Sequence, residues 1–481
     1  MKKNNQESIN YVLNQASENK VKFIRLWFTD LFGNIKGFGI TDYEFEKVLN
    51  EGMSFDGSSI FGTERSNETE MIAFPDPTTF QILPWRPDEP SVAKINCDIL
   101  NKDGSPSNFD SRYILKSKVS DLVNNGLNFY VAPEIEYYYL ESSESMDPID
   151  EKTYFDQIGI HGDLGSDLRR NTVLGLEKMG IPIQKFHHEV SPGQQEISLR
   201  YSDSVTMADS FQTFKIIVKE IAMLSDVFAT FMPKPFEEFE GNGMHLHISL
   251  FKDDKNLFAQ NSSKSGISKD GEFFTAGLLK HVKDFMIITN QWVNSYKRIV
   301  SNNESPSHIS WSNTPNNFNL ITIPKIREGS EDSSRIEFRL PDPGCNPYLT
   351  FASIITAGLN GMKNKYKLEK PTQKEDELKI TSQKNILDEN EYKNKIIELK
   401  KKANEYRNER NKDINSFNKK KIEATNKLLN TINPILIEYS NKNSISMIFQ
   451  KKNIIIGKSE LDVTDDILKI VDSKIKKIKI N

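Results

Sequence analysis

The sequence has few cysteines and no long apolar run. Cys97 and Cys345 are its two cysteines, too few and too scattered for a disulfide framework or a Cys-x-x-Cys metal site. The start, MKKNNQESIN, has basic residues with no apolar segment after them. Nowhere do the roughly 18 apolar residues of a membrane span run together. We therefore expect a cytoplasmic protein with no export signal and no membrane partner.

The chain also has no excess of basic residues. Lys plus Arg number 63 against 67 Asp plus Glu, which gives a formal net charge of -4. Such a chain has no basic field for nucleic acid, so we expect no nucleic-acid partner. Its hydrophobic content of 37% is low, but a chain of this length still builds substantial cores and has room for several domains.

Composition and patterning divide the chain into three parts. Residues 15–101 contain short strand patterns with turn signals, which predict a small β-rich domain. Residues 108–365 mix alternating strands with helical spacing and predict the larger domain. Residues 366–481 are rich in Lys and Asn, and we expect a mainly helical segment; the alternative is a disordered tail. The clearest candidate helices run over residues 167–179, 204–229 and 347–362.

Three short segments place acidic residues, histidines or arginines at every second position. Strict alternation is typical of a β-strand with its polar set on one face. Taken alone, a pair of alternating glutamates more often lies on an exposed strand face, and a single histidine on a strand is more often a hydrogen-bonded core residue. A face that collects several carboxylates must neutralise them, however, and a divalent metal does this. The segments are Glu134-Ile135-Glu136, His245-Leu246-His247-Ile248-Ser249 and Arg335-Ile336-Glu337-Phe338-Arg339.

The segment FHHEVSPGQQEISLR adds two more carboxylates, Glu189 and Glu196. A turn at Ser191-Pro192-Gly193 brings them onto neighbouring strands. His187 and His188 precede Glu189, but paired histidines beside a strand are often structural, so we predict neither as a ligand. Oxygen-rich ligation favours Mg²⁺ or Mn²⁺ over zinc, and arginines beside such a metal are typical of phosphoryl chemistry on ATP.

Longer motifs give the pattern a specific resemblance. FDGSSI, APEIE, HHEVSPGQQE, GNGMHLHISL, NSYKRIV with Glu304 after it, and RIEFRLPDPGCNPYL occur in the order and approximate spacing of type I glutamine synthetases. The chain resembles that family over about residues 21–362. The resemblance implies an α+β fold, in which an N-terminal β-grasp domain precedes a larger catalytic domain with a curved antiparallel sheet and surrounding helices.

The resemblance also implies an activity and partners. The family forms glutamine from glutamate, ammonium and ATP through γ-glutamyl phosphate, with two or more Mg²⁺ or Mn²⁺ ions per active site. It assembles as homo-oligomers, typically dodecamers of two hexameric rings, with active sites between subunits.

Each motif residue then receives an implied role. The implied ligands of the metal that anchors glutamate and ammonia are Glu136, Glu189 and Glu196. The implied ligands of the metal at the ATP phosphates are Glu134, His245 and Glu337. The implied ATP contacts are His247, Ser249, Arg335 and Gln184, and the implied substrate contacts are Gly241, Arg298, Glu304 and Arg339, of which the two arginines also hold phosphate. The resemblance makes Asp56, from a neighbouring subunit, the base that deprotonates ammonium, and Glu304 the flap residue that shields the acyl phosphate.

The chain departs from the family pattern at several positions. Two arginines expected at about Asn316 and Ile321 are absent, and Lys325 or Arg327 are the candidates to replace them. Gln184 stands where a glutamate is usual, and Glu240 stands where an asparagine is usual. Two alternatives therefore stay open: a γ-glutamyl ligase for a polyamine or methylamine, and a catalytically weak regulatory or structural homologue.

Overall fold

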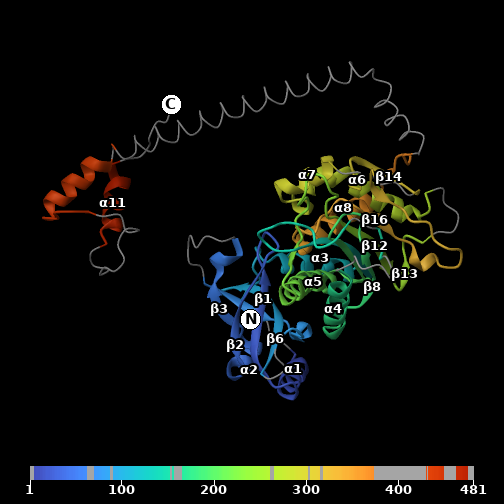
Figure 1. Ribbon diagram of the computed structural model, residues 1–481. Helices are drawn as coiled ribbons and strands as arrows, with labels where there is room; N and C mark the ends of the chain where they lie inside the picture. The colour runs from blue at the N-terminus through green and yellow to red at the C-terminus, as the bar shows by residue number, and fades with distance from the viewer. Residues whose placement is uncertain are drawn as a thin grey trace. The chain divides into compact units, whose positions relative to one another are not determined.

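The computed structural model divides the chain into two compact units, Met1–Asp376 and Glu377–Asn481, and Figure 1 shows their elements. Among the described residues, no helix is long and apolar enough to cross a membrane. In the second unit the described elements include helix α11 (Thr464–Lys474). The mainly helical segment expected over residues 366–481 lies mostly outside the described residues. The structure describes residues 5–61, 70–86, 90–151, 154–156, 165–259, 265–301, 304–314, 318–372, 430, 432–448 and 462–474.

The N-terminal part of the first unit is a small sheet in the order β2-β1-β6-β4-β3, with β5 beside β6. The β1–β2 connection is a tight turn, because Asp30 Oδ1 accepts hydrogen bonds from the N–H groups of Phe32 and Asn34. Gly33, at φ 81°, supplies the left-handed residue. Two helices, α1 (Gln6–Glu18) and α2 (Asp42–Glu51), pack with the sheet. The strands are β1 (Val21–Thr29), β2 (Ile35–Thr41), β3 (Met53–Asp56), β4 (Glu70–Pro75), β5 (Gln81–Ile82) and β6 (Ser91–Asn101).

A larger sheet follows in the order β14-β15-β16-β12-β7-β9-β8. Its neighbours pair antiparallel except β14 and β15, which are parallel. The short strands β10 (Ser202–Asp203) and β11 (Phe228–Thr230) pair with β7, and β13 (Lys255–Asn256) pairs with β12. The main strands are β7 (Leu127–Leu140), β8 (Ile183–His188), β9 (Gln194–Leu199), β12 (Met244–Lys252), β14 (His308–Ser312), β15 (Asn319–Thr322) and β16 (Ile336–Phe338).

Helices pack around this sheet and form the main core with it (Figure 1). Helices α3 and α5 pack against β7, and α4 packs against β8 and β9. Helices α6 and α8 approach so closely that a Cβ on Gly277 would lie 2.3 Å from the carbonyl oxygen of Ala357. The helices are α3 (Ser111–Val123), α4 (Gly165–Lys178), α5 (Ser204–Leu224), α6 (Lys269–Thr289), α7 (Val293–Ser301) and α8 (Pro347–Asn364).

The helices expected over residues 167–179 and 347–362 are confirmed as α4 and α8. The helix expected over residues 204–229 is too long, because α5 ends at Leu224 and residues 228–230 form β11. The backbone leaves the helix at Asp226, with φ 56°, and Phe228 then pairs with Leu140 of β7. The apolar spacing predicted that residues 228 and 229 continue the helix, but pairing with β7 places them in a strand instead. The two sheets with their helices form the expected α+β fold.

Candidate functional site

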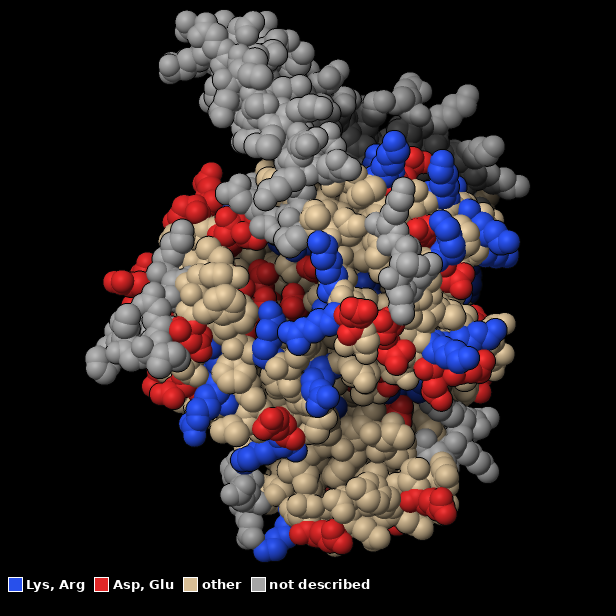
Figure 2. Space-filling model, turned by 90° about the vertical axis from the view of Figure 1, so that its right-hand side faces the viewer, with Lys and Arg blue, Asp and Glu red and all other residues tan. Residues whose placement is uncertain are grey.

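Strand register brings the polar residues of the large sheet together. His245 of β12 lies opposite Glu134 of β7, and Glu196 of β9 lies opposite Glu136 of β7. Directly opposed residues project to the same face of a sheet. The alternation seen in the sequence is therefore confirmed as one polar face. Figure 2 shows acidic side chains inside a hollow on one side of the molecule, with basic side chains next to them.

Glu134, His245 and Glu337 form a first group able to hold a metal ion, which we call the Glu134 cluster. His245 Nδ1 lies 3.6 Å from Glu134 Oε2 and 3.6 Å from Glu337 Oε1. These separations are long for hydrogen bonds, but ligands about 2.1 Å from one octahedral ion lie about 3–4 Å apart. Burial favours a higher pKa for Glu134, but the nearby imidazoles of His245 and His247 hold that pKa well below its usual range. Glu134 is thus ionised at neutral pH.

His187, Glu189 and Glu196 form a second group able to hold a metal, the Glu189 cluster. His187 Nε2 lies 3.4 Å from Glu196 Oε1, and His187 Nδ1 lies 3.8 Å from Glu189 Oε1. Burial and then the charge of Glu196 raise the pKa of Glu189 to about 7. Glu196 is also buried, yet its contact with His187 lowers its pKa. The crowding of these carboxylates favours a bound cation.

Glu136 lies close to the Glu189 cluster without belonging to that group of three. Its Oε2 accepts hydrogen bonds from the N–H of Gly243 at 2.8 Å and from Gln194 Nε2 at 3.2 Å. Burial, with the charge of Glu189 adding to it, raises the pKa of Glu136 to about 7, although the nearby side chains of His245 and Arg298 act to lower it. The Nε2 atoms of His187 and His245 lack hydrogen bonds within the described chain. Such imidazoles together with buried carboxylates form a ligand set that fits divalent metals.

Lys185 lies between the two clusters. Its Nζ is 3.3 Å from Glu196 Oε1 and 3.6 Å from Glu134 Oε1, and its side chain is 49% exposed. Burial lowers the pKa of Lys185, but the charges of Glu196 and Glu134 outweigh this and leave it raised. The ammonium is therefore a cation that contacts both ligand groups and also reaches solvent.

Two arginines that flank β16, one just before the strand and one just after it, lie at the Glu134 cluster. Arg339 donates from Nη1 to Glu337 Oε1 at 3.1 Å and from Nη2 to the carbonyl oxygen of Glu304 at 3.2 Å. Arg335 donates from Nε to His247 Nδ1 at 3.2 Å. The predicted flap residue and both arginines are thus brought to the same face as the carboxylates.

The remaining predicted residues differ in how closely they approach the clusters. Arg298 is buried, and its guanidinium donates to backbone carbonyl groups, including that of Leu340 at 3.0 Å. The carbonyl oxygen of Gly241 accepts a hydrogen bond from Gln194. Gln184 is exposed on β8, and Ser249 lies further along the same strand as His245. Asp56 lies in the other sheet, on β3, where its Oδ1 accepts a hydrogen bond from the N–H of Ser58.

The structure corrects one position in the segment where the two expected arginines are absent. We expected the second missing arginine at about Ile321, but Ile321 is fully buried and belongs to the main core. Its neighbour Thr322 lies opposite Glu337 and therefore on the polar face. Asn316 lies outside the described residues. Lys325 and Arg327 are exposed and form no ion pair with a described residue, so their expected role in place of the arginines stays a prediction.

Sequence reasoning missed Lys185, His187 and Thr322. The signal for the first two was present, because Lys185, His187 and Glu189 are spaced two apart along β8 and just after it. We set His187 aside as structural, whereas His188 is the structural one: its Nε2 lies 2.9 Å from the buried Asp150 Oδ1. Alternation therefore indicated the right face, and only the packed structure separated the two histidines.

The chain matches known proteins over both sheets. Residues 20–102 match the family described as glutamine synthetase, beta-Grasp domain, and residues 108–390 match glutamine synthetase, catalytic domain. A further match, to outer membrane protein (OmpH-like), covers residues 356–471.

Curated relatives span most of the chain. A glutamine synthetase of Mycolicibacterium smegmatis is 43% identical over 364 residues, 74% of this chain and 81% of that protein. Those of Clostridium saccharobutylicum (44% over 357 residues, 73% and 79%) and Methanosarcina mazei (43% over 365 residues, 75% and 80%) are similar to the same extent.

Proposed function

Because the chain belongs to the glutamine synthetase family, we propose that it forms glutamine from glutamate, ammonium and ATP, as an ATP-dependent glutamate-ammonia ligase. The observation that carries the proposal is the polar face of the large sheet, on which two metal-ligand groups lie together. Two adjacent groups of this kind fit an enzyme that must hold a nucleotide and a second anion side by side.

We assign Mg²⁺ or Mn²⁺ to both groups. The Glu134 cluster is assigned to the ATP phosphates. Glu136, Glu189 and Glu196 are assigned to the side of glutamate and ammonia, and the contact of His187 with Glu196 adds that imidazole as a further candidate ligand. When bound, such ions offset the charge of the phosphoryl group as it moves to the carboxylate of glutamate.

Basic and polar side chains are proposed to position ATP and glutamate. Arg339 lies between Glu337 and the backbone of Glu304, so its guanidinium can hold a phosphate at the Glu134 cluster. Arg298 acts differently, because its hydrogen bonds go to backbone carbonyl groups, and we propose that it fixes the strand end that carries Arg339. The ATP contacts are assigned to His247, Ser249, Arg335 and Gln184, and Gly241 is assigned to glutamate.

Lys185 is proposed to replace part of the missing arginine charge. Its ammonium contacts carboxylates of both ligand groups and is half exposed, so an ATP phosphate can reach it. Losing a hydrogen bond to a charged group costs about 1.5–3 kcal/mol, or roughly tenfold or more in affinity. Lys185→Met should therefore weaken ATP binding, measured by calorimetry, while Lys185→Arg retains it. Equal ATP affinity in Lys185→Met and the parent would remove this role.

Ammonium activation is assigned to Asp56 and Glu304. A carboxylate beside ammonium raises the fraction of neutral ammonia able to attack, and Glu304 excludes water from the acyl phosphate. Because Asp56 lies on β3 of the small sheet, we propose that it serves the site of a neighbouring subunit in a homo-oligomer, a dodecamer of two hexameric rings. We assign residues 15–101 to the β-grasp domain and residues 108–365 to the catalytic domain; the place of residues 366–481 stays a prediction.

The relatives do not favour the alternative of a polyamine or methylamine ligase. The deciding experiment supplies the purified chain with Mg²⁺ or Mn²⁺, ATP and glutamate, and measures phosphate release with and without ammonium. We expect ammonium-dependent release, and Glu337→Gln, which removes one ligand of the Glu134 cluster, should abolish it. Release that requires a larger amine, or no release at all, would contradict the proposal.

A further inference from the structure

The candidate metal ligands differ in what holds them in place. His187 and Glu196 of the Glu189 cluster lie on β8 and β9, and every member of the Glu134 cluster lies on a strand. Glu189 is different, because β8 ends at His188 and Glu189 begins the turn that leads to β9. Strand pairing fixes the place of the other ligands, whereas a ligand in a turn needs support from elsewhere.

A buried acid and a buried imidazole supply that support. His188 alternates with His187 along β8, so its side chain points away from the polar face. His188 Nε2 lies 2.9 Å from Asp150 Oδ1, and both side chains are completely buried. We call these two residues the Asp150–His188 pair. Neither residue is among the assigned metal ligands, ATP contacts or substrate contacts.

The Asp150–His188 pair holds both ends of the turn. His188 Nδ1 lies 2.6 Å from the carbonyl oxygen of Glu189, and the N–H of Gly193 donates to Asp150 Oδ1. The N–H of Glu189 donates to the carbonyl oxygen of Gln194 at 2.8 Å. Backbone pairing therefore holds one side of Glu189, and the pair holds the other side and ties it to the far end of the turn.

The turn also contacts the rest of the site through two side chains. Gln194 Nε2 donates to Glu136 Oε2 at 3.2 Å and to the carbonyl oxygen of Gly241 at 3.2 Å. Ser191 Oγ accepts a hydrogen bond from the N–H of Glu240 at 2.9 Å. A shift of the turn would therefore move one metal ligand, and it would loosen contacts of a second carboxylate and of the segment assigned to glutamate.

The backbone of His188 is fixed as well. Strand β8 ends the order of the described strands, and the outer side of His188 binds loop groups instead of another strand. Asp156 Oδ1 accepts its N–H at 2.9 Å, and the N–H of Phe155 donates to its carbonyl oxygen at 3.2 Å. The buried Arg169 donates from Nη2 to the same Asp156 Oδ1 at 2.7 Å. His188 is therefore a firm point from which the turn can be held.

The Asp150–His188 pair is a poor source of stability. Taking an acid and an imidazole out of water costs free energy that their mutual contact returns only in part. Asp150 Oδ2 is also buried, and it has no hydrogen-bond partner among the residues that the structure describes. What the pair supplies is a fixed geometry at the two ends of the turn.

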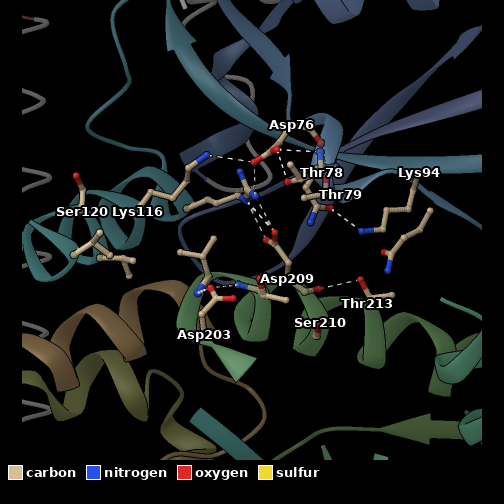
Figure 3. A pocket seen from close by; sticks show the side chains of 17 residues that line it. Asp76, Thr78, Thr79, Lys94, Lys116, Ser120, Asp203, Asp209, Ser210 and Thr213 are labelled. Atoms are coloured by element: carbon tan, nitrogen blue, oxygen red, sulfur yellow. Dashed lines mark hydrogen bonds and ion pairs between the residues drawn. The ribbon is translucent and has the colours of Figure 1, made fainter. Parts of the chain in front are cut away.

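A second buried network serves as a comparison. Around a cavity of about 520 Å³ between the small sheet and helices α3 and α5, Arg112 and Lys116 pair with Asp76, Asp98 and Asp209 (Figure 3). No assigned metal, ATP or substrate residue lines that cavity. A change in this network should therefore alter stability without altering the two metal-ligand groups.

We propose that Asp150 and His188 are positioning residues, which set the place of Glu189 and thereby the affinity of the Glu189 cluster for Mg²⁺ or Mn²⁺. The inference rests on the proposed function, which assigns Glu189 to the metal on the side of glutamate and ammonia. Removing a group that holds a metal ligand from behind typically costs about 10–100-fold in metal affinity. Asp150 and His188 act on the metal only through Glu189 and the turn.

The test titrates Mn²⁺ into the full chain by calorimetry, without ATP or glutamate. Asp150→Ala should weaken one class of Mn²⁺ sites about 10–100-fold and leave the other class unchanged, because strands hold the Glu134 cluster. The titration is repeated with Glu337→Gln added to the parent and to the variant. That change removes one ligand of the Glu134 cluster, so the remaining class reports on the Glu189 cluster.

Two amide variants separate the contacts of His188. The amide nitrogen of Gln takes the place of the imidazole Nε2, and that of Asn takes the place of Nδ1. His188→Gln therefore keeps a donor toward Asp150 and loses the contact with Glu189, whereas His188→Asn does the reverse. Both should weaken Mn²⁺ binding, since the turn needs the unbroken series of contacts. Asp150→Asn keeps the size and one acceptor oxygen of the acid, so it should lose less affinity than Asp150→Ala.

Steady-state kinetics and a matched control separate positioning from a general loss of structure. In Asp150→Asn the KM for glutamate should rise while the KM for ATP stays unchanged. A variant that merely unfolds part of the protein loses kcat and keeps both KM values. Asp76→Asn makes the same chemical change in the network of Figure 3. It should lower the unfolding temperature and leave Mn²⁺ affinity unchanged.

Thermal unfolding confirms that each variant is folded, and if Asp150→Ala is not, Asp150→Asn and the two His188 variants carry the test. The proposal is overturned if folded variants bind Mn²⁺ like the parent, if both classes weaken equally, or if Asp76→Asn weakens Mn²⁺ binding as much as Asp150→Asn. Mn²⁺ binding requires no turnover, so these results do not depend on whether the chain forms glutamine. The phosphate-release assay with ammonium decides that question separately.

Discussion

Metal binding should release protons near neutral pH, because two proposed ligands hold theirs in the metal-free protein. The pKa values of Glu136 and Glu189 are each raised to about 7, first by burial and then by neighbouring carboxylates. A metal binds the deprotonated groups. At pH 7 each carboxyl is about half protonated, so the pair releases about one proton on binding a metal. His187, whose pKa is also raised, adds to this number.

The sign and size of the pH dependence follow directly. Metal affinity should increase as pH rises through 7, because fewer protons must leave, and should level off above about pH 8, where both carboxyls are ionised. The measurement is calorimetric titration of Mn²⁺ into metal-free protein at pH 7 and pH 8.5, in buffers of different ionisation enthalpy. The dependence of the observed heat on the buffer gives the number of protons released.

A matched variant isolates the carboxyl responsible. Glu136→Gln keeps the size of the side chain but removes its proton, so release at pH 7 should fall by about half a proton. Ser202→Ala, a surface change at β10, should leave the release unchanged. The reasoning is refuted if Mn²⁺ binds at pH 7 without releasing protons, or if Glu136→Gln releases as many as the parent.

Three further predictions concern other parts of the structure. Asp56→Ala should abolish ammonium-dependent turnover and leave ATP binding intact, measured by phosphate release and calorimetry; full turnover would remove Asp56 from the mechanism. Arg112→Met leaves the buried Asp209 without its cation partner and should cost about 3–5 kcal/mol of unfolding free energy in denaturant titration, whereas Lys118→Met, at an exposed position, should stay within about 0.5 kcal/mol. Thr322→Arg places a cation on the face of Glu337 and should tighten ATP binding, whereas Ile321→Arg buries a charge in the core and should lower the unfolding temperature strongly; the reverse order would show that the register of β15 is misassigned.

The sequence determined the polar face and most of its members. Alternation alone indicated Glu134, Glu136, His245 and Glu337, because the side chains of a strand point to opposite faces in turn. The turn at residues 191–193 likewise followed from its Pro-Gly pair, and Gly193 has the left-handed backbone, with φ 70°. These are local properties, and they survive folding because they depend on near neighbours in the chain.

Only the tertiary structure decided which polar residues share a site. Periodicity spaced His187 two residues from Lys185 and Glu189, but only the packing of Asp150 against His188 separated the two histidines. It also placed Thr322, not Ile321, opposite Glu337, a difference of one residue that strand pairing sets. Register, burial and the distances between charges are properties of the packed chain, so the pairing of the candidate ligands emerged only with the fold.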